Sequence, residues 1–385
     1  MIPRQAATTL ARLAHGYPVL VLTGPRQAGK TTLARAAFAG KRYVSLESPD
    51  ERQFAAEDPR GFLARFPDGG IIDEAQHCPS LFSYLQTLVD LDGRMGLFVL
   101  TGSQNFGLLA EITQSLAGRA GVVQLLPFGL AELSAAGIAP AMLDELLLRG
   151  LYPPLYDRPL ETDSWYASYV MTYLERDVRQ LANVHDLNLF QRFLRLCAAR
   201  SGQLLNLSNL ALETGVSANT ARNWLSILEA SYLIHLLPPH HRNLGKRVVK
   251  TPKLYFFDSG LAAALMGIRT TEQMALHPQR GSLFETFVVA EFLKRRFNAG
   301  LSSNLYFWRD NSGTEVDLLV EEGAALHPVE IKSGQTYTPD MAAALNKWRR
   351  YAGECAGPPR IVYGGGESFQ RSGVRVRSWR ELFED

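Results

Sequence analysis

The sequence predicts an α/β protein in which a parallel β-sheet core comes first, a helical and winged-helix domain follows, and a second α/β domain comes last. An apolar, β-branched run at 19–22 leads into a glycine-containing loop and a helix, and a second apolar run at 69–72 ends in two acidic residues. Further on, apolar residues recur at helical spacing between 162 and 199, and strand-like runs return after residue 300. With 385 residues, the chain is long enough for two or three domains with separate cores.

Composition and charge favour a globular intracellular protein. Apolar residues make up 46% of the chain, and the formal net charge is only +2, so affinity for nucleic acid has to come from local clusters of basic residues. Three widely spaced cysteines show no metal-ligand pattern and fit a reducing compartment; they are Cys78, Cys197 and Cys355. No apolar run reaches the roughly 18–20 residues of a membrane helix, and no signal-peptide pattern opens the sequence. We therefore expect a cytoplasmic protein with no membrane partner.

The loop after the first apolar run has the composition of a phosphate-binding loop. It comprises Gly24, Pro25, Arg26, Gln27, Ala28, Gly29, Lys30, Thr31 and Thr32. The glycines let the backbone curl so that successive N–H groups point at phosphate oxygens, and the N-terminus of the following helix at 31–38 adds partial positive charge. Lys30 would reach the β- and γ-phosphates, and Thr31 would coordinate Mg²⁺. The alternative is a glycine-rich turn before an ordinary helix.

The acidic pair that ends the second apolar run predicts hydrolysis as well as binding. Asp73, at the end of the strand, can hold the Mg²⁺ shell, and Glu74 can activate the attacking water as a general base. A third strand at 97–101 leads into polar residues that include Ser103, which would sense the γ-phosphate from between the other two strands. The alternative for the acidic pair is two solvated acids at a turn.

Arg119 is a candidate arginine finger, supplied within the chain or by a neighbouring subunit. A finger that acts between subunits requires self-association, and we therefore expect a homo-oligomer such as a ring. The alternative is a surface arginine on a loop.

A proline-rich stretch at 151–159 predicts a linker that closes the first domain. We therefore place the domains at 1–150, 151–268 and 269–385. Within the second domain, amphipathic spacing predicts helices at 162–182 and 187–199.

The segment after these helices predicts a helix-turn-helix. A first helix stops at Gly215, which can adopt left-handed geometry, and Ser217 caps a second helix at 218–232. Asn219 and Arg222 lie early in this second helix, where such motifs contact DNA.

The next segment has the pattern of a wing. Strands at 233–237 and 253–257 flank a loop without acidic residues, as expected of a winged helix. The basic residues of this loop include Arg242, Lys246, Arg247 and Lys250. Contacts from them to DNA or RNA phosphates would be independent of sequence and sensitive to salt. The alternative is a protein-interaction module whose charges are merely solvated.

The C-terminal third carries a second cluster of chemistry-bearing residues. A helix at 282–291 holds Glu285, and three strands follow at 306–309, 315–320 and 327–332. Side chains at i and i+2 on a strand share a face, so Glu330 and Lys332 point where Asp317 points. Asp317 and Glu330 would bind Mg²⁺, and Lys332 would orient or activate water for attack on a phosphodiester. The alternative is a nuclease-like fold without activity.

These motifs together resemble a family of prokaryotic AAA+-type ATPases whose C-terminal half is a domain of unknown function. The matching segments are GPRQAGKTT (24–32), DEAQ (73–76), LTGSQ (100–104), SLAGR (115–119), YLERDV (173–178), FDSGL (257–261), FE (284–285) and EIKS (330–333). The resemblance covers nearly the whole chain. It implies an ASCE-class core that uses ATP rather than GTP, a winged-helix module and a restriction-endonuclease-like tail.

The function predicted from the sequence is an Mg²⁺-dependent ATPase that acts on DNA, with ATP turnover driving conformational change in the later modules. Two alternatives stay open. In one, the protein is an ATP-gated signalling switch that binds protein and not DNA. In the other, the tail is a working nuclease licensed by the ATPase, as in a defence system.

Overall fold

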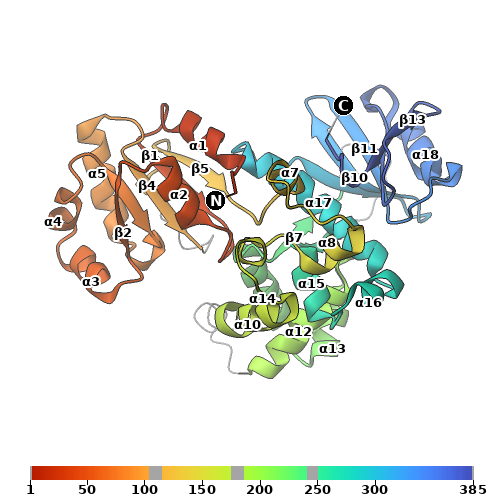
Figure 1. The fold of residues 1–385 in the computed structure, drawn as a ribbon, viewed down its shortest axis with the longest axis horizontal. Coiled ribbons are helices and arrows are strands. Elements are labelled where there is room, and N and C mark those ends of the chain that lie inside the picture. Colours follow the sequence, from red (N-terminus) through yellow and green to blue (C-terminus); the bar gives the residue numbers. More distant parts are fainter. Residues whose placement is uncertain (1, 104–114, 175–185, 241–249, 384–385) are drawn as a thin grey trace.

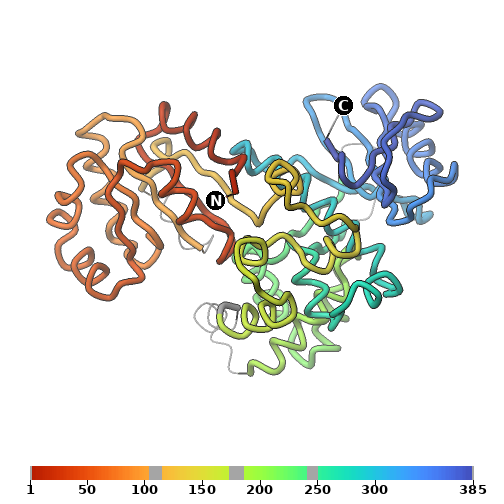
Figure 2. Tube along the Cα trace, viewed as in Figure 1, coloured from red at the N-terminus to blue at the C-terminus, as the bar shows by residue number. Residues whose placement is uncertain are grey.

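A computed structural model describes residues 2–103, 115–174, 186–240 and 250–383. The chain forms three parts that follow one another in the sequence, coloured red to orange, yellow to teal and blue in Figure 2. The first and third parts are each built on a β-sheet, and the middle part is mainly helical (Figure 1).

The first part is built on a parallel sheet with strand order β2-β3-β4-β1-β5. Its strands are β1 (Val19–Thr23), β2 (Arg42–Ser45), β3 (Gly70–Asp73), β4 (Phe98–Gly102) and β5 (Ala120–Gln124). The predicted parallel core is therefore confirmed, and β4 lies between β1 and β3. Because helices cover both faces, β1 and β4 are buried along their whole length and read as continuous apolar runs.

Helices of the first part flank this sheet (Figure 1). They are α1 (Ala6–Leu13), α2 (Lys30–Ala37), α3 (Pro49–Glu57), α4 (Pro59–Ala64), the 3₁₀ turn η1 (Ala75–His77) and α5 (Leu81–Asp92). One apolar cluster packs α4 and α5 against the sheet through Phe62, Phe82 and Phe98, and another packs α1 and α2 through Leu10 and Leu33. These two clusters hold the ends of β1 and β3 in a fixed relation, and the loops that follow those strands carry the predicted site.

The middle part contains short helices and a small antiparallel sheet in the order β6-β8-β7. Its elements are α7 (Leu130–Ala135), α8 (Leu143–Arg149), α9 (Pro154–Asp157), α10 (Thr162–Tyr169), the π-helix η2 (Val170–Leu174), α12 (Leu187–Ala199), β6 (Gln203–Leu204), α13 (Leu207–Thr214), α14 (Ala218–Ala230), β7 (Ile234–Leu237), β8 (Lys253–Phe256), α15 (Ser259–Leu265) and α16 (Thr271–Leu276).

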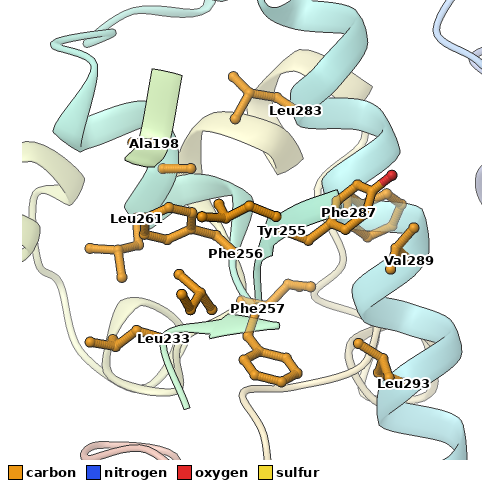
Figure 3. Packing of buried hydrophobic residues seen from close by; sticks show 14 of the residues in the cluster. Ala198, Leu233, Tyr255, Phe256, Phe257, Leu261, Leu283, Phe287, Val289 and Leu293 are labelled. Atoms are coloured by element: carbon orange, nitrogen blue, oxygen red, sulfur yellow. The ribbon is translucent and has the colours of Figure 1, made fainter. Parts of the chain in front are cut away.

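The long helix α17 (Arg280–Asn298) joins the middle and third parts into one core. Phe287, Val289 and Leu293 on this helix belong to one apolar cluster with Tyr255, on β8, and Phe257, directly after it (Figure 3). The same apolar cluster extends to α7 and α8, so the predicted boundary at residue 150 falls inside this packing unit.

The third part is a mixed sheet in the order β13-β14-β12-β11-β10-β9. Its elements are β9 (Leu305–Arg309), β10 (Glu315–Glu322), β11 (Ala325–Lys332), η3 (Pro339–Ala342), α18 (Ala343–Ala352), η4 (Gly353–Cys355), β12 (Arg360–Tyr363), β13 (Phe369–Arg371) and β14 (Val374–Ser378). Helix α18 covers one face through Leu345 and Trp348, and α17 packs on the other.

Two predicted helices differ in detail from the sequence pattern. The helix expected at 162–182 is an α-helix only to Tyr169, where a π-helical turn continues to Leu174, and its remainder lies outside the described residues. The helix expected to reach Tyr232 ends at Ala230, because Tyr232 has a left-handed backbone with φ 56°. Within the described ranges, no helix combines the length and apolarity needed to cross a membrane.

Candidate functional site

The loop between β1 and α2 has the backbone shape that phosphate binding requires. Gly24 has φ 145°, and a Cβ atom at this position would lie 2.0 Å from the carbonyl oxygen of Leu125. Gly29 has φ 89° and stands directly before the first residue of α2. Both positions exclude a side chain, one by close approach and both by conformation, so the curl depends on glycine.

Lys30 lies inside this loop. Its side chain is buried, and its ammonium group donates hydrogen bonds to the carbonyl oxygens of Gly24 (2.9 Å) and Pro25 (2.8 Å). The loop therefore holds a positive charge within its own curl, at the N-terminus of a helix, where anions bind most favourably.

The predicted Mg²⁺ ligands lie side by side. The Thr31 hydroxyl donates to Asp73 Oδ1 over 2.9 Å, and the Tyr43 hydroxyl donates to Asp73 Oδ2 over 2.9 Å. The hydroxyl of Thr101, on β4, also donates to Asp73. Burial, followed by the neighbouring Asp73 charge, raises the pKa of Tyr43 to about 12, so this phenol stays a donor. A carboxylate and a hydroxyl form the hard oxygen set that suits Mg²⁺.

Glu74, the residue after Asp73, has an unusual backbone conformation. Its φ is 52°, in the left-handed region that a non-glycine residue rarely adopts, as is common at functional sites. Ser103 Oγ donates to Glu74 Oε2 over 2.9 Å, and the side-chain amide of Gln76 donates to the same oxygen. Burial alone would raise the pKa of Glu74, but the Lys30 charge and these hydrogen bonds outweigh it, so the pKa is lowered. Glu74 is therefore ionised at neutral pH, as a general base must be.

These groups face a cavity of about 460 Å³. Its loop-derived lining consists of Arg26, Gln27, Gly29, Lys30, Thr31 and Thr32. Glu47, Asp73 and Glu74 also line it, at or just after the ends of β2 and β3. The rest of the lining is made by Pro153, Pro154, Asp157 and Arg158, which the sequence pattern had suggested only as a linker. The middle part of the chain therefore contributes directly to the cavity.

An apolar pocket of about 340 Å³ adjoins this cavity and shares Gly29, Thr32, Pro153 and Asp157 with it. Its other walls include Ile2, Pro3, Ala36 and Phe128. Sequence reasoning missed this pocket, because its walls come from segments more than 100 positions apart.

Arg4 was also missed, although it contacts the loop directly. Its buried guanidinium donates to the carbonyl oxygens of Ala28 and Leu126, each over 2.7 Å, and pairs with Glu132 at 3.1 Å. It thereby ties the phosphate-binding loop to the segment that follows β5. A lone arginine near the N-terminus carries no local signal of this role.

Arg119 does not lie in the cavity of its own chain. Its guanidinium is partly exposed and pairs with Asp90 on α5, with Nε 2.5 Å from Oδ1. A role within the chain is therefore not supported by this arrangement. A role toward a neighbouring subunit stays a prediction.

The helix-turn-helix region has the predicted turn. Gly215 ends α13 with φ 89°, and the Ser217 hydroxyl accepts a hydrogen bond from the Thr220 backbone N–H and caps α14. Asn219 and Arg222 are exposed on α14 and lie within hydrogen-bonding distance of each other at 3.2 Å. Lys250 is exposed, whereas Arg242, Lys246 and Arg247 lie outside the described residues.

The C-terminal carboxylates come together at the junction of α17, β10 and β11. One oxygen each of Glu285, Glu315 and Asp317 lies within 4.8 Å of the others. Asp317 stands where the pairing of β10 with β9 shifts register between Val316 and Leu319, and such bulges re-aim side chains. Glu315 was missed, although its i,i+2 relation to Asp317 was a signal that could have found it.

Lys332 lies beside these groups, as the sequence pattern predicted. Its ammonium is 2.5 Å from Glu330 Oε1 and 3.7 Å from Asp317 Oδ2. Burial, and next the Asp317 charge, raises the pKa of Glu330 to about 8. Burial is also the main reason that the pKa of Glu285 is raised to about 7. Burial, together with the neighbouring negative charge, therefore favours the protonated form of both carboxyl groups.

The strand order, the curled loop with Lys30, and Asp73 beside Glu74 define a P-loop ATPase of the AAA type. Residues 16–134 match the family described as "AAA domain". Residues 141–272 and 280–382 match two domains of unknown function, DUF8612 and DUF4143.

The chain belongs to the family of the uncharacterized proteins Rv2008c of Mycobacterium tuberculosis and Mb2031c of Mycobacterium bovis. It is 35% identical to each over 347 residues, which cover 89% of this chain and 76% of each relative.

Solved structures with similarity include the Walker-type ATPase PABY2304 of Pyrococcus abyssi, with 17% identity and a TM-score of 0.46 over 69% of this chain and 96% of that one. AMPPCP-bound DnaA from Aquifex aeolicus is similar over 58% of this chain and 85% of its own, with 14% identity and a TM-score of 0.30.

Proposed function

We propose that this AAA-type ATPase acts on DNA, and that Mg²⁺-dependent ATP turnover changes the position of its helix-turn-helix and C-terminal parts. The observation that supports the proposal most strongly concerns the cavity of about 460 Å³ beside the phosphate-binding loop, which we call the phosphate cavity. Its lining comes from two parts of the chain. Pro153, Pro154, Asp157 and Arg158 of the middle part line the same cavity as Lys30 and Asp73, so a bound polyphosphate would touch both parts at once. A nucleotide can shift a conformational equilibrium only through such differential contacts.

A second contact links the phosphate-binding loop to the helix-turn-helix. The Tyr232 hydroxyl hydrogen-bonds to Thr23 Oγ1 over 2.7 Å, and Thr23 directly precedes the loop. Tyr232 follows α14 and is buried with φ 56°, a conformation that the surroundings must hold in place. Movement of the loop would therefore reach the base of the helix that carries Asn219 and Arg222.

The adjoining apolar pocket offers a site for the nucleotide base. It borders the phosphate cavity at Gly29 and Thr32, and Ile2, Ala36 and Phe128 give it apolar walls. Apolar contact with a few polar groups at the rim is the common way to hold a flat heterocycle. We propose that it receives adenine, so that Mg²⁺-ATP spans the two cavities.

The DNA-binding surface in this proposal is a winged helix formed by α12–α14 and the β6-β8-β7 sheet. Asn219, Arg222 and Lys250 would contact DNA, together with the wing residues Arg242, Lys246 and Arg247. The exposure of Arg222 and Lys250 supports this proposal.

DNA should raise the rate of ATP hydrolysis, and a panel of linear, branched and single-stranded DNA would identify the preferred form. Lys30→Ala is the inactive reference. Binding should weaken with salt at a slope of about 0.9 per phosphate contact, and Arg222→Ala should lower that slope by about one. The matched control is Arg350→Ala, an exposed arginine on α18, which should leave the slope unchanged. No stimulation by any of these DNAs would favour a protein-binding switch.

A DNA nuclease licensed by the ATPase is the second candidate, favoured by the grouping of Asp317, Glu330 and Lys332. With Mg²⁺ or Mn²⁺ and ATP, the protein should nick or linearise a plasmid, and Asp317→Ala should abolish cleavage because it removes a carboxylate that would hold the metal. Plasmid left intact by the wild-type protein under all these conditions would mean that this part has no nuclease activity.

A further inference from the structure

A buried lysine from the middle part reaches into the C-terminal carboxylate cluster. Lys253, the first residue of β8, has a side chain only 3% exposed. Its ammonium is 2.9 Å from Glu285 Oε1 and forms an ion pair with Glu315. The lysine therefore lies on one sheet, and the acids that it neutralises lie on α17 and on another sheet.

The position of this ammonium matches that of a bound cation. Glu285, Glu315 and Asp317 each present an oxygen within 4.8 Å of the others, which is the kind of oxygen set that holds Mg²⁺ or Mn²⁺. An ammonium with three N–H donors can satisfy several such acceptors at once. A metal ion and the Lys253 ammonium would therefore compete for the same carboxylates.

A second observation, on Glu330, also points to a cation site at this cluster. Glu330 has a side chain only 7% exposed, and one of its oxygens accepts from Lys332. Its other oxygen, Oε2, is buried and has no hydrogen-bond partner among the described residues. A buried carboxylate oxygen without a partner is costly, and it is a ligand that an incoming metal ion would satisfy.

We propose that Lys253 is a built-in cation that blocks a divalent-metal site formed by Glu285, Glu315, Asp317 and Glu330, and that metal binding there requires β8 to withdraw the lysine. The inference rests on the nuclease-like site proposed above, because the metal would bind at the same carboxylates. Its readout is cation binding, which does not depend on whether the site cleaves DNA.

The other end of β8 shows how withdrawal could be controlled. Two residues beyond the strand, Asp258 accepts a hydrogen bond from the backbone N–H of Leu151 over 2.7 Å. Leu151 begins the segment from which Pro153, Pro154, Asp157 and Arg158 line the cavity beside Lys30 and Asp73. One short strand therefore connects the wall of the nucleotide site to the lysine in the carboxylate cluster.

Mn²⁺ binding to full-length protein tests the proposal, measured without nucleotide by the electron paramagnetic resonance signal of free Mn²⁺. Lys253→Met should gain a site that binds Mn²⁺ about tenfold or more tightly than wild type does, because a positive charge has been removed from among the ligands. The double variant Lys253→Met with Asp317→Asn should lose that gain. The result would show that the added Mn²⁺ binds at the carboxylate cluster and not at Thr31 and Asp73. Lys294→Met is the matched control, since Lys294 is also buried but pairs with Glu291 outside the cluster.

Two outcomes would overturn the proposal. One is Asp317-dependent Mn²⁺ binding that is equally tight in wild type and Lys253→Met, because the lysine would then not compete. The other is no added Mn²⁺ binding in a folded Lys253→Met protein, because the carboxylates would then not form a metal site. Should circular dichroism show that Lys253→Met is unfolded, Lys253→Gln keeps an N–H donor for Glu285 and decides between the same outcomes. A gain of Mn²⁺ binding without plasmid cleavage would uphold this inference and contradict the nuclease.

Discussion

Replacement of Glu74 by glutamine should slow ATP hydrolysis by about 10²–10⁴-fold while ATP still binds. The amide has the size of the carboxylate but cannot take a proton from the attacking water. The groups proposed to hold the nucleotide are unchanged, namely Lys30, Thr31 and the curled loop. The effect should therefore fall on the rate constant for hydrolysis and leave the dissociation constant for ATP near that of wild type.

Phosphate release and calorimetric ATP binding would measure the two quantities separately. The matched control is Glu57→Gln on α3, an exposed residue that hydrogen-bonds only to the neighbouring Gln53 in the described contacts. Because the Lys30 charge and two hydrogen bonds outweigh burial and hold the pKa of Glu74 below its usual 4.5, the base stays ionised as the pH falls to that value. Loss of activity through protonation of Glu74 is thus expected only below about pH 4.5. A Glu74→Gln protein that hydrolyses ATP at the wild-type rate would show that another group is the base.

The same variant tests whether Arg119 acts on a neighbouring subunit. Glu74→Gln subunits retain Arg119, and Arg119→Ala subunits retain Glu74. If the arginine works between subunits, a mixture of the two inactive proteins should regain hydrolysis at sites that combine an intact base with an intact finger. Equal activity of Arg119→Ala and wild type would instead assign Arg119 to its surface pairing with Asp90.

The parallel core and the phosphate site could be predicted because their signals are local. A strand, a glycine-containing loop and a helix follow one another within 19–37, and the acidic pair lies at the end of its strand. Parallel strands then bring Thr31, Asp73 and Ser103 to one edge, since their carboxyl ends lie at the same side of the sheet. The i,i+2 spacing of Glu330 and Lys332 was similarly sufficient to place both beside Asp317.

Contacts between distant segments could not be predicted in this way. Arg4 reaches Ala28, Tyr232 reaches Thr23, and Lys253 reaches Glu315, and each pair depends on how whole parts of the chain pack. Packing between distant segments sets these positions, and a single sequence shows only that a residue is apolar or charged. Arg119 illustrates the same limit, because its partner Asp90 lies on a different element.

Replacement of Asp258 by alanine should lower the free energy of unfolding by about 3–5 kcal/mol. The carboxylate is only 2% exposed and accepts three hydrogen bonds, from the backbone N–H groups of Leu151 (2.7 Å) and Leu261 (2.9 Å) and from the Tyr166 hydroxyl (2.6 Å). Alanine would leave the backbone N–H groups of Leu151 and Leu261 without this acceptor, whereas the Tyr166 hydroxyl would keep the carbonyl oxygen of Arg149 at 3.0 Å. The carboxylate fits closely in this site, since a Cβ atom on Gly150 would lie 2.3 Å from Asp258 Oδ1.

The same replacement should also weaken ATP binding, because Leu151 anchors the segment that supplies Pro153 and Arg158 to the phosphate cavity. Urea unfolding would give the stability change, and calorimetry on the folded fraction would give the affinity for ATP. Asp163→Ala is the matched control: Asp163 pairs with Arg269 at 3.5 Å on the surface, and its loss should cost less than about 1 kcal/mol. If Asp258→Ala is destabilised but binds ATP like wild type, this segment supports the fold without shaping the nucleotide site. The proposed connection through β8 to Lys253 would then lack its link to the nucleotide.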